Sequence, residues 1–143
     1  MPPQDFSILP YDDALHREQV VDLWRAVFGY DAPHNEPGLV IDKKLAVDDG
    51  LFFVALSQGC VLGTVMAGYD GHRGWIYSLA VPPEARGQGL GSALLAHAQE
   101  QLAARGCIKV NLQVVEGNET ALRFYEARGF CVEARASMGK KLG

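Results

Sequence analysis

Arg86, Gly87, Gly89 and Gly91 stand at a spacing that suits the binding of a phosphate or pyrophosphate group. An apolar, strand-like run from Trp75 to Val81 precedes them, and a helical pattern of leucines and alanines follows. In such a strand–turn–helix corner, backbone N–H groups without bulky side chains can point at one anion, and the helix N-terminus adds a partial positive charge. The stretch therefore predicts an anion-binding corner.

The spacing of these glycines excludes two common nucleotide loops. A dinucleotide fingerprint needs G-x-G-x-x-G/A, and counting from Gly87 places Ser92 at its last position. Counting from Gly89 places Leu94 there. A nucleotide P-loop needs G-x-x-x-x-G-K-[ST], and residues 45–108 contain no lysine. The pattern that fits is R-x-x-G-x-G, formed by Arg86, Gly89 and Gly91. The alternative interpretation is that these glycines form a surface turn that caps a helix and bind no ligand.

Length, composition and charge narrow the class of protein. The 143 residues, 48% hydrophobic and 21% charged, predict a single globular domain over residues 1–143. The net charge of −4 argues against a nucleic-acid partner, since such proteins normally carry a basic face. The first residues do not resemble a signal peptide, and no run reaches the roughly 20 apolar residues of a membrane span. A cytoplasmic protein without a membrane partner is expected.

The cysteines and histidines predict no metal site. Cys60, Cys107 and Cys131 lie far apart in the sequence and form no C-x-x-C pair. The four histidines are equally scattered. We therefore expect three reduced, half-buried thiols and no bound metal.

The rest of the chain predicts the elements that position the corner. The strand 107–115 comes after a helix of about four turns, so a right-handed crossover should place it parallel to Trp75–Val81. The hairpin 51–69 should be antiparallel to its neighbours, which gives an α+β domain with one mixed sheet. The expected strands are 6–10, 51–56, 60–69, 75–81 and 107–115, with closing pieces at 130–133 and 137–142. The expected helices run from an N-cap at Asp12 or Asp13 to Gly29, over about 37–47, from the glycine loop to 105, and from Asn118 to Gly129.

Four signals in the right order resemble the GNAT superfamily of N-acetyltransferases. Two of them are Leu79-Ala-Val-Pro-x-x-Arg86 and the R-x-x-G-x-G loop that follows. The others are Asn118-x-x-Ala-x-x-x-Tyr125, followed by Glu-x-x-Gly-Phe130, and the closing Met138-x-Lys-x-Leu142. The resemblance implies a GNAT-type fold: a mixed, mostly antiparallel sheet with one parallel strand pair at the cofactor cleft, and helices on both faces. Gly68–Gly74 is similar to a loop of a group of small, poorly characterised bacterial members.

The resemblance also implies the chemistry and the residues that perform it. The cosubstrate is acetyl-CoA, no metal takes part, and a primary amine attacks the thioester directly. Backbone groups of Leu79, Ala80 and Val81 hold the acetyl carbonyl and the pantetheine arm. Tyr125 is the expected catalytic residue, the general acid for the coenzyme A sulfur. The remaining expected cofactor-binding residues are Arg86, Gly87, Gln88, Gly89, Leu90, Gly91 and Ser92 at the pyrophosphate, with Asn118 and Tyr125 on the last helix.

The general base and the acceptor site stay open at this point. The strand Trp75–Val81 carries no carboxylate, so either Glu116 or a water held by Tyr77 or Ser78 can take the amine proton. Alternatively, Glu116 is an exposed side chain with no part in the reaction. His72 and Arg73 are either acceptor-site residues or the tip of a solvated turn, and the loop Tyr30–Asn35 is a second candidate for acceptor recognition.

Several functions fit this reading. The first is N-acetyltransfer to a small-molecule amine or a protein amine. The alternatives are acetylation of a protein N-terminus, as in ribosomal-protein acetyltransferases, a non-catalytic acyl-CoA-binding module, and another nucleotide binder. GNAT domains often form dimers, so the resemblance allows a homodimer, but the sequence does not give the oligomeric state.

Overall fold

The structure, a computed structural model, describes residues 5–29 and 33–143, which form two units. The first unit is Met1–Leu112 and the second is Gln113–Gly143, and each is described by itself. Residues 30–32, which belong to the predicted acceptor loop, lie outside the described residues.

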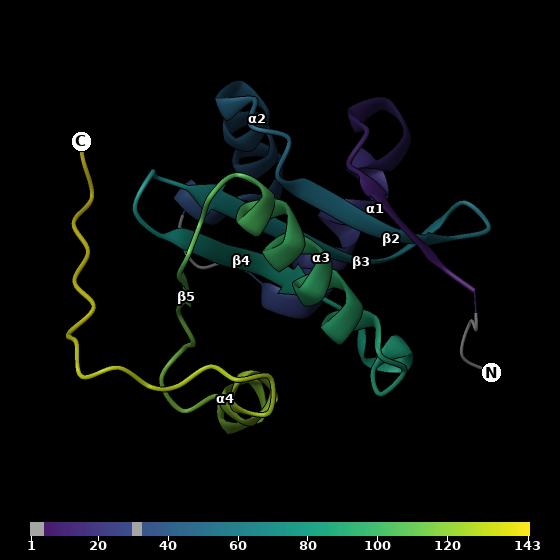
Figure 1. The fold of residues 1–143 in the computed structure, drawn as a ribbon. Helices are drawn as coiled ribbons and strands as arrows, with labels where there is room; N and C mark the ends of the chain where they lie inside the picture. The colour runs from purple at the N-terminus through teal and green to yellow at the C-terminus, as the bar shows by residue number, and fades with distance from the viewer. Residues whose placement is uncertain (1–4, 30–32) are drawn as a thin grey trace. The chain divides into compact units, whose positions relative to one another are not determined.

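A mixed sheet forms the centre of the first unit (Figure 1). Its strands follow one another in chain order, and each pairs antiparallel with the next until the last. The last two strands pair in parallel, which confirms the predicted parallel pairing. The strands of the described residues are β1 (Ser7–Pro10), β2 (Phe52–Ser57), β3 (Cys60–Tyr69), β4 (Gly74–Ala80) and β5 (Val110–Leu112).

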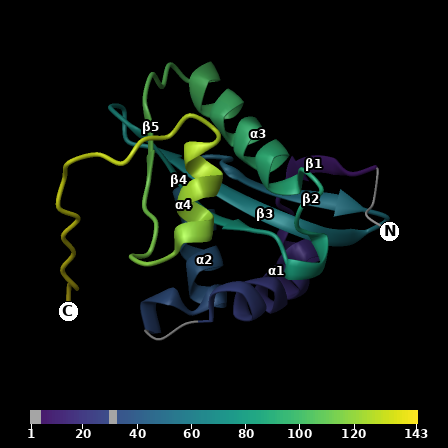
Figure 2. The same cartoon turned by 90° about the horizontal axis from the view of Figure 1, so that it is seen from below.

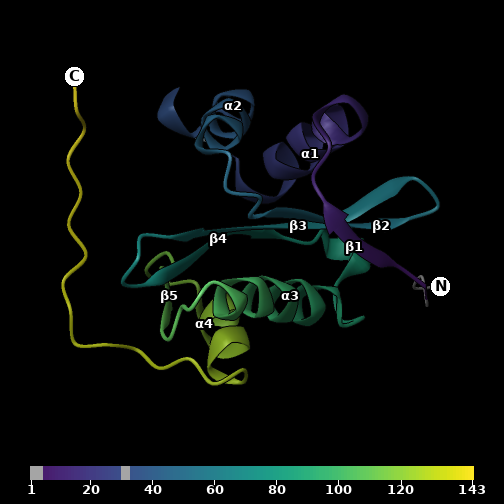
Figure 3. The same cartoon turned by 45° about the horizontal axis from the view of Figure 1, so that its top comes forward.

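Helices cover both faces of this sheet. The helices α1 (Asp13–Phe28) and α2 (Pro37–Val47) lie on one face, and α3 (Leu90–Ala104) lies on the other (Figures 2 and 3). The predicted apolar face of α3 is buried, at Leu90, Leu94, Leu95, Ala98 and Leu102. The core on the opposite side joins α1 and α2 to the sheet through Val20, Leu23, Trp24, Ile41, Phe52, Val54, Met66 and Ala80. The predicted fold class is confirmed.

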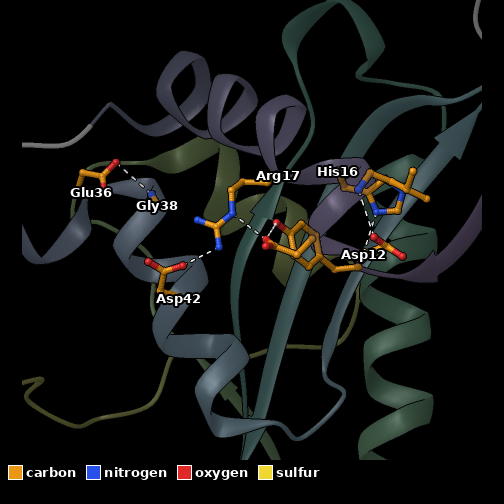
Figure 4. Close-up of polar contacts among 9 residues, drawn as sticks. Asp12, His16, Arg17, Glu36, Gly38 and Asp42 are labelled. Atoms are coloured by element: carbon orange, nitrogen blue, oxygen red, sulfur yellow. Dashed lines mark hydrogen bonds and ion pairs between the residues drawn. The ribbon is translucent and has the colours of Figure 1, made fainter.

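Polar side chains set the ends of α1 and α2 and tie the two helices together. The Asp12 carboxylate accepts the Leu15 N–H, as an N-cap residue does. Glu36 plays the same part for α2 by accepting the N–H groups of Gly38 and Leu39. Figure 4 shows Arg17 of α1 donating to Asp42 of α2 at 2.6 Å. The two helices therefore present a joined layer to the sheet.

Lys44 of α2 is a buried cation beside β4. Its side chain is 5% exposed, and its ammonium group donates to Asp49 Oδ2 at 2.8 Å. It also donates to the Ala67 carbonyl of β3 and to the Tyr77 hydroxyl of β4 at 3.1 Å. The three donors of the ammonium group thus meet three acceptors, which is how a buried charge is tolerated.

Replacing Asp49 with alanine should destabilise the fold by about 2 kcal/mol, because it leaves the Lys44 ammonium buried without its counter-ion. Urea unfolding followed by circular dichroism measures this change. Asp42→Ala is the matched control, since it removes a carboxylate that is 64% exposed from its pair with Arg17. That variant should lose less than about 1 kcal/mol. Equal losses in the two variants would contradict a special role for the buried pair.

The second unit consists of one short helix and irregular chain. Asn118 caps α4 (Glu119–Glu126) by accepting the Ala121 N–H at 3.1 Å, as predicted. The helix ends at Glu126, before the predicted Gly129. The closing strands expected at 130–133 and 137–142 are wrong, since 130–143 are irregular and almost entirely exposed. A strand is held by its partner, and no other strand lies within this unit to pair with them.

Candidate functional site

The C-terminal half of β4 contains a β-bulge at Ser78. Thr64 of β3 pairs with Ala80, whereas Met66 pairs with Tyr77, so β4 carries one residue more than β3 over this interval. Ser78 takes the left-handed conformation, with φ of 52°. An extra residue reverses the alternation of side chains along a strand. As a result Ala80, rather than Leu79, joins the core against α1.

Past the bulge, β4 has an open edge on the side of β5. The two parallel strands pair only through Gly74–Ile76 with Val110–Leu112. In the part of the chain that the structure describes, β5 offers no partner to Tyr77–Ala80. Strand-edge N–H and C=O groups of this kind can bind a ligand that lies along the strand. The predicted residues Leu79, Ala80 and Val81 therefore sit at or just beyond an open strand end.

The loop from Val81 to Ser92 turns directly from this strand end into α3. A short 3-10 turn, Pro83–Ala85, opens the loop, and the Arg86 Nε donates to the Val81 carbonyl at 3.0 Å. Gly87 and Gly89 have φ of 79° and 82°, which favours glycine at both positions. The structure therefore brings the predicted residues 79–92 together in one corner of the first unit.

The start of α3 has the features of an anion-binding helix end. Gly89 is the N-cap and supplies no side-chain acceptor to the first turn. The first N–H groups of a helix lack acceptors within the helix and carry its positive dipole end. Gly91 and Ser92 lie half-buried in this first turn, whereas the side chain of Leu90 is buried in the core. Leu90 therefore offers only its backbone to a ligand.

Gln88 gives the loop an unusual polar atom. Its Nε2 donates weakly to the Glu84 carbonyl at 3.4 Å. Its Oε1 is buried and has no hydrogen-bond partner among the described residues. Buried acceptors are normally paired, so an unpaired one beside a predicted binding loop suits a site completed by a ligand.

Tyr125 lies on α4 and Asn118 is the N-cap of that helix, both in the second unit. The Tyr125 ring packs edge-on against Phe124 and Phe130, with ring centres 5.1 and 5.7 Å away. Burial raises the pKa of Tyr125 above the ordinary value of 10. A phenol in this state stays protonated at neutral pH and can donate a proton, as the predicted role requires. Asn118 uses its side-chain oxygen to cap the helix.

Some candidates for the general base and for the acceptor site have exposed side chains, and another is held by a hydrogen bond. Glu116 is exposed. His72 is also exposed, in a turn where the Asp70 carboxylate accepts the N–H groups of His72 and Arg73, which lowers the pKa of Asp70. Tyr77, by contrast, is held by Lys44 through its hydroxyl. The turn geometry rests on Asp70 and on Gly71, whose φ is 92°, so it explains nothing about the His72 and Arg73 side chains.

The structure adds residues that the sequence reading did not assign to the site. Thr64 is fully buried and links Trp24 of α1 to the bulge at Ser78. Its polarity in the middle of an apolar strand was the available signal. Gly63 of β3 allows β4 and α3 to approach β3 closely. A Cβ at this position would lie 2.9 Å from the Ala80 carbonyl oxygen and 2.9 Å from a Leu94 methyl group.

Cysteines and other metal-ligand types do not gather in the described residues. Cys60 and Cys131 are exposed and Cys107 is half-buried, all as free thiols, so the expectation of half-burial is wrong for two of them. Across residues 5–29 and 33–143, no three His, Cys, Asp or Glu side chains group as metal ligands would. Over the same residues, none of the helices has the length and apolar character needed to span a membrane.

Comparison with known proteins identifies relatives of this fold. The model of the family described as "Acetyltransferase (GNAT) family" matches residues 17–130. A PaiA N-acetyltransferase from Thermoplasma acidophilum, solved with coenzyme A, is 17% identical with a TM-score of 0.81, over 93% of this chain and 94% of that one. AAC(6')-Iy, solved with the bisubstrate analogue CoA-S-monomethyl-acetylneamine, is 18% identical with a TM-score of 0.76, over 98% and 100%. The ribosomal-protein-S18-alanine N-acetyltransferase from Escherichia coli is 22% identical with a TM-score of 0.70, over 87% and 77%.

Proposed function

Because the chain belongs to the acetyltransferase (GNAT) family, we propose that it transfers the acetyl group of acetyl-CoA to a primary amine by direct attack on the thioester. The observation that carries the proposal is the continuous corner from Leu79 to Ser92. There an open strand edge runs into a loop with two left-handed glycines and then into a helix N-terminus without a side-chain cap. That corner offers backbone groups to the pantetheine arm and positive N–H groups to the pyrophosphate.

Each expected residue except Asn118 has a defined part in this reaction. The Arg86–Ser92 loop anchors the pyrophosphate, and the N–H groups of Leu79–Val81 polarise the acetyl carbonyl. The neutral amine forms the new C–N bond, and the C–S bond of the thioester breaks. Tyr125 then donates its phenolic proton to the leaving thiolate and regains one from solvent. The second proton of the attacking amine passes to a base, either Glu116 or a water held by Tyr77 or Ser78.

The acceptor is an amine of a small molecule or of a protein. AAC(6')-Iy was solved with an acetylneamine analogue and the Escherichia coli neighbour acts on a ribosomal-protein alanine, so similar folds serve both kinds of acceptor. Acetylation of a protein N-terminus is therefore the second candidate for this chain. A non-catalytic acyl-CoA-binding module is the third, and the strand without a carboxylate is the feature in its favour.

Two measurements test the proposal. Calorimetric titration with acetyl-CoA, CoA, ATP and NAD should give binding of the first two only. Thiol release from acetyl-CoA over a panel of polyamines, amino acids, aminoglycosides and peptides with free N-termini should then identify the acceptor class. Binding of ATP or NAD without binding of either coenzyme A species would overturn the proposal. Binding of acetyl-CoA with no release for any amine would favour the non-catalytic module.

A further inference from the structure

The bulge at Ser78 is a local conformation that needs support. A serine with φ of 52° lies in the left-handed region, which residues with a Cβ seldom occupy. Such conformations persist where the surrounding structure over-determines them. The structure shows what surrounds this one: a chain of two hydrogen bonds reaching from α1 through β3 to the Ser78 carbonyl.

The Trp24 Nε1 donates to the Thr64 hydroxyl at 2.9 Å, and that hydroxyl donates to the Ser78 carbonyl at 2.8 Å. Chemistry fixes the direction of both bonds. An indole N–H only donates and a carbonyl only accepts, so the Thr64 hydroxyl must accept from Trp24 and turn its proton toward Ser78. The chain is therefore polarised in one sense from α1 to the bulge.

Because Trp24 and Thr64 are buried, breaking these two hydrogen bonds would cost free energy. Trp24 is 3% exposed and Thr64 is 0% exposed, so water cannot replace either partner. If Ser78 returned to a regular strand conformation, its carbonyl would turn away and leave the Thr64 proton buried without an acceptor. The bulged conformation is therefore the one in which all three polar groups are satisfied.

We propose that Trp24 and Thr64 are positioning residues that hold the Ser78 bulge and, through it, aim the backbone N–H groups of Leu79–Val81 at the acetyl carbonyl. The inference rests on the proposed function, because it assigns a purpose to the aim of those groups. It separates two tasks within the site. The Arg86–Ser92 loop sets how tightly coenzyme A binds. The chain of hydrogen bonds from Trp24 through Thr64 to Ser78, which we call the relay, sets how well the acetyl group is recognised.

The test compares the affinities of acetyl-CoA and CoA by calorimetry in the wild type, Thr64→Val and Thr64→Ser. Valine keeps the shape of threonine and removes the hydroxyl, whereas serine keeps the hydroxyl. In Thr64→Val the affinity for acetyl-CoA should fall about fivefold to tenfold while that for CoA stays within about twofold. Thr64→Ser should keep both affinities within about twofold of the wild type. An equal loss for both ligands, or no loss for either, would overturn the relay.

Two further measurements keep the inference testable if that variant folds poorly or the ligands fail to bind. Trp24→Phe leaves the Thr64–Ser78 bond in place and removes the first donor, so it should lower acetyl-CoA affinity by about twofold to threefold and leave CoA affinity unchanged. Unchanged acetyl-CoA affinity in that variant would count against the relay. Wild-type protein that binds neither coenzyme A species would defeat the proposed function alone. The relay is then judged by the amide NMR shifts of residues 78–80 in Thr64→Val: displaced shifts support it, and unchanged shifts overturn it.

Discussion

Replacing Tyr125 with phenylalanine is expected to lower the rate of acetyl transfer by about 100-fold and to leave the affinity for acetyl-CoA within about twofold. The substitution removes the phenolic proton and keeps the ring that packs against Phe124 and Phe130. Its effect should therefore fall on protonation of the leaving thiolate rather than on binding. Thiol-release kinetics gives kcat, and calorimetry gives the affinity.

The pH profile provides a second check on Tyr125. Burial raises the pKa of Tyr125, so the proton-donating form is fully populated at neutral pH and is lost only as pH rises past a value above 10. An alkaline decline of kcat beginning above pH 10 is expected in the wild type and should be missing from Tyr125→Phe.

Tyr69→Phe is the matched control for this substitution. Among the residues that the structure describes, the Tyr69 hydroxyl makes only long contacts, at 3.4 Å, with the Gly71 and Gly106 carbonyls, and it has no assigned part in the reaction. Its rate should equal that of the wild type. A Tyr125→Phe enzyme with an unchanged rate would remove Tyr125 from the mechanism and leave solvent as the acid.

Replacing Gly89 with alanine is expected to weaken the binding of both acetyl-CoA and CoA by about 10- to 100-fold. Gly89 has φ of 82° at the N-cap of α3, and its Cβ position is open, with no atom within 4 Å. A methyl group there meets no protein atom but stands where a pyrophosphate would approach the helix N–H groups. Because both ligands share the pyrophosphate, both affinities should fall together in calorimetric titrations.

Gly71→Ala separates this effect from backbone strain. Gly71 has φ of 92° and is equally open, but it lies in the turn between β3 and β4. The two variants should lose similar stability, about 1 kcal/mol, because each forces alanine into the left-handed region. Only Gly89→Ala should lose affinity. A similar loss of affinity in Gly71→Ala would mean that strain, rather than the loop, explains the result.

The parts of the fold that depend on local pattern could be predicted from the sequence. The leucine spacing of α3 and the crossover rule were enough to place β4 and β5 side by side in parallel. The strand–loop–helix corner was predictable for the same reason, because Leu79–Ser92 is one continuous stretch whose glycines mark the turn.

The parts that depend on long-range contacts could not be predicted. The run Trp75–Val81 reads as an uninterrupted strand, and only its register against β3 reveals the extra residue at Ser78. The sequence around Lys44 gives no local sign of burial, yet Asp49, Ala67 and Tyr77 satisfy its charge inside the fold. The strands expected after Gly129 are absent from the structure, because a strand-like residue pattern does not supply a pairing partner.

The open edge of β4 has a consequence for how this protein changes over evolutionary time. The groups expected to hold the cofactor there are peptide N–H groups, which every residue but proline carries. A cofactor held in this way is recognised through the backbone shape, and a mutation at Leu79 leaves those donors in place. Selection for a new acceptor can therefore act on the side chains of this strand without erasing the recognition of the old cofactor. The irreplaceable positions are instead those that impose the shape, such as Gly63 with its contact to the Ala80 carbonyl.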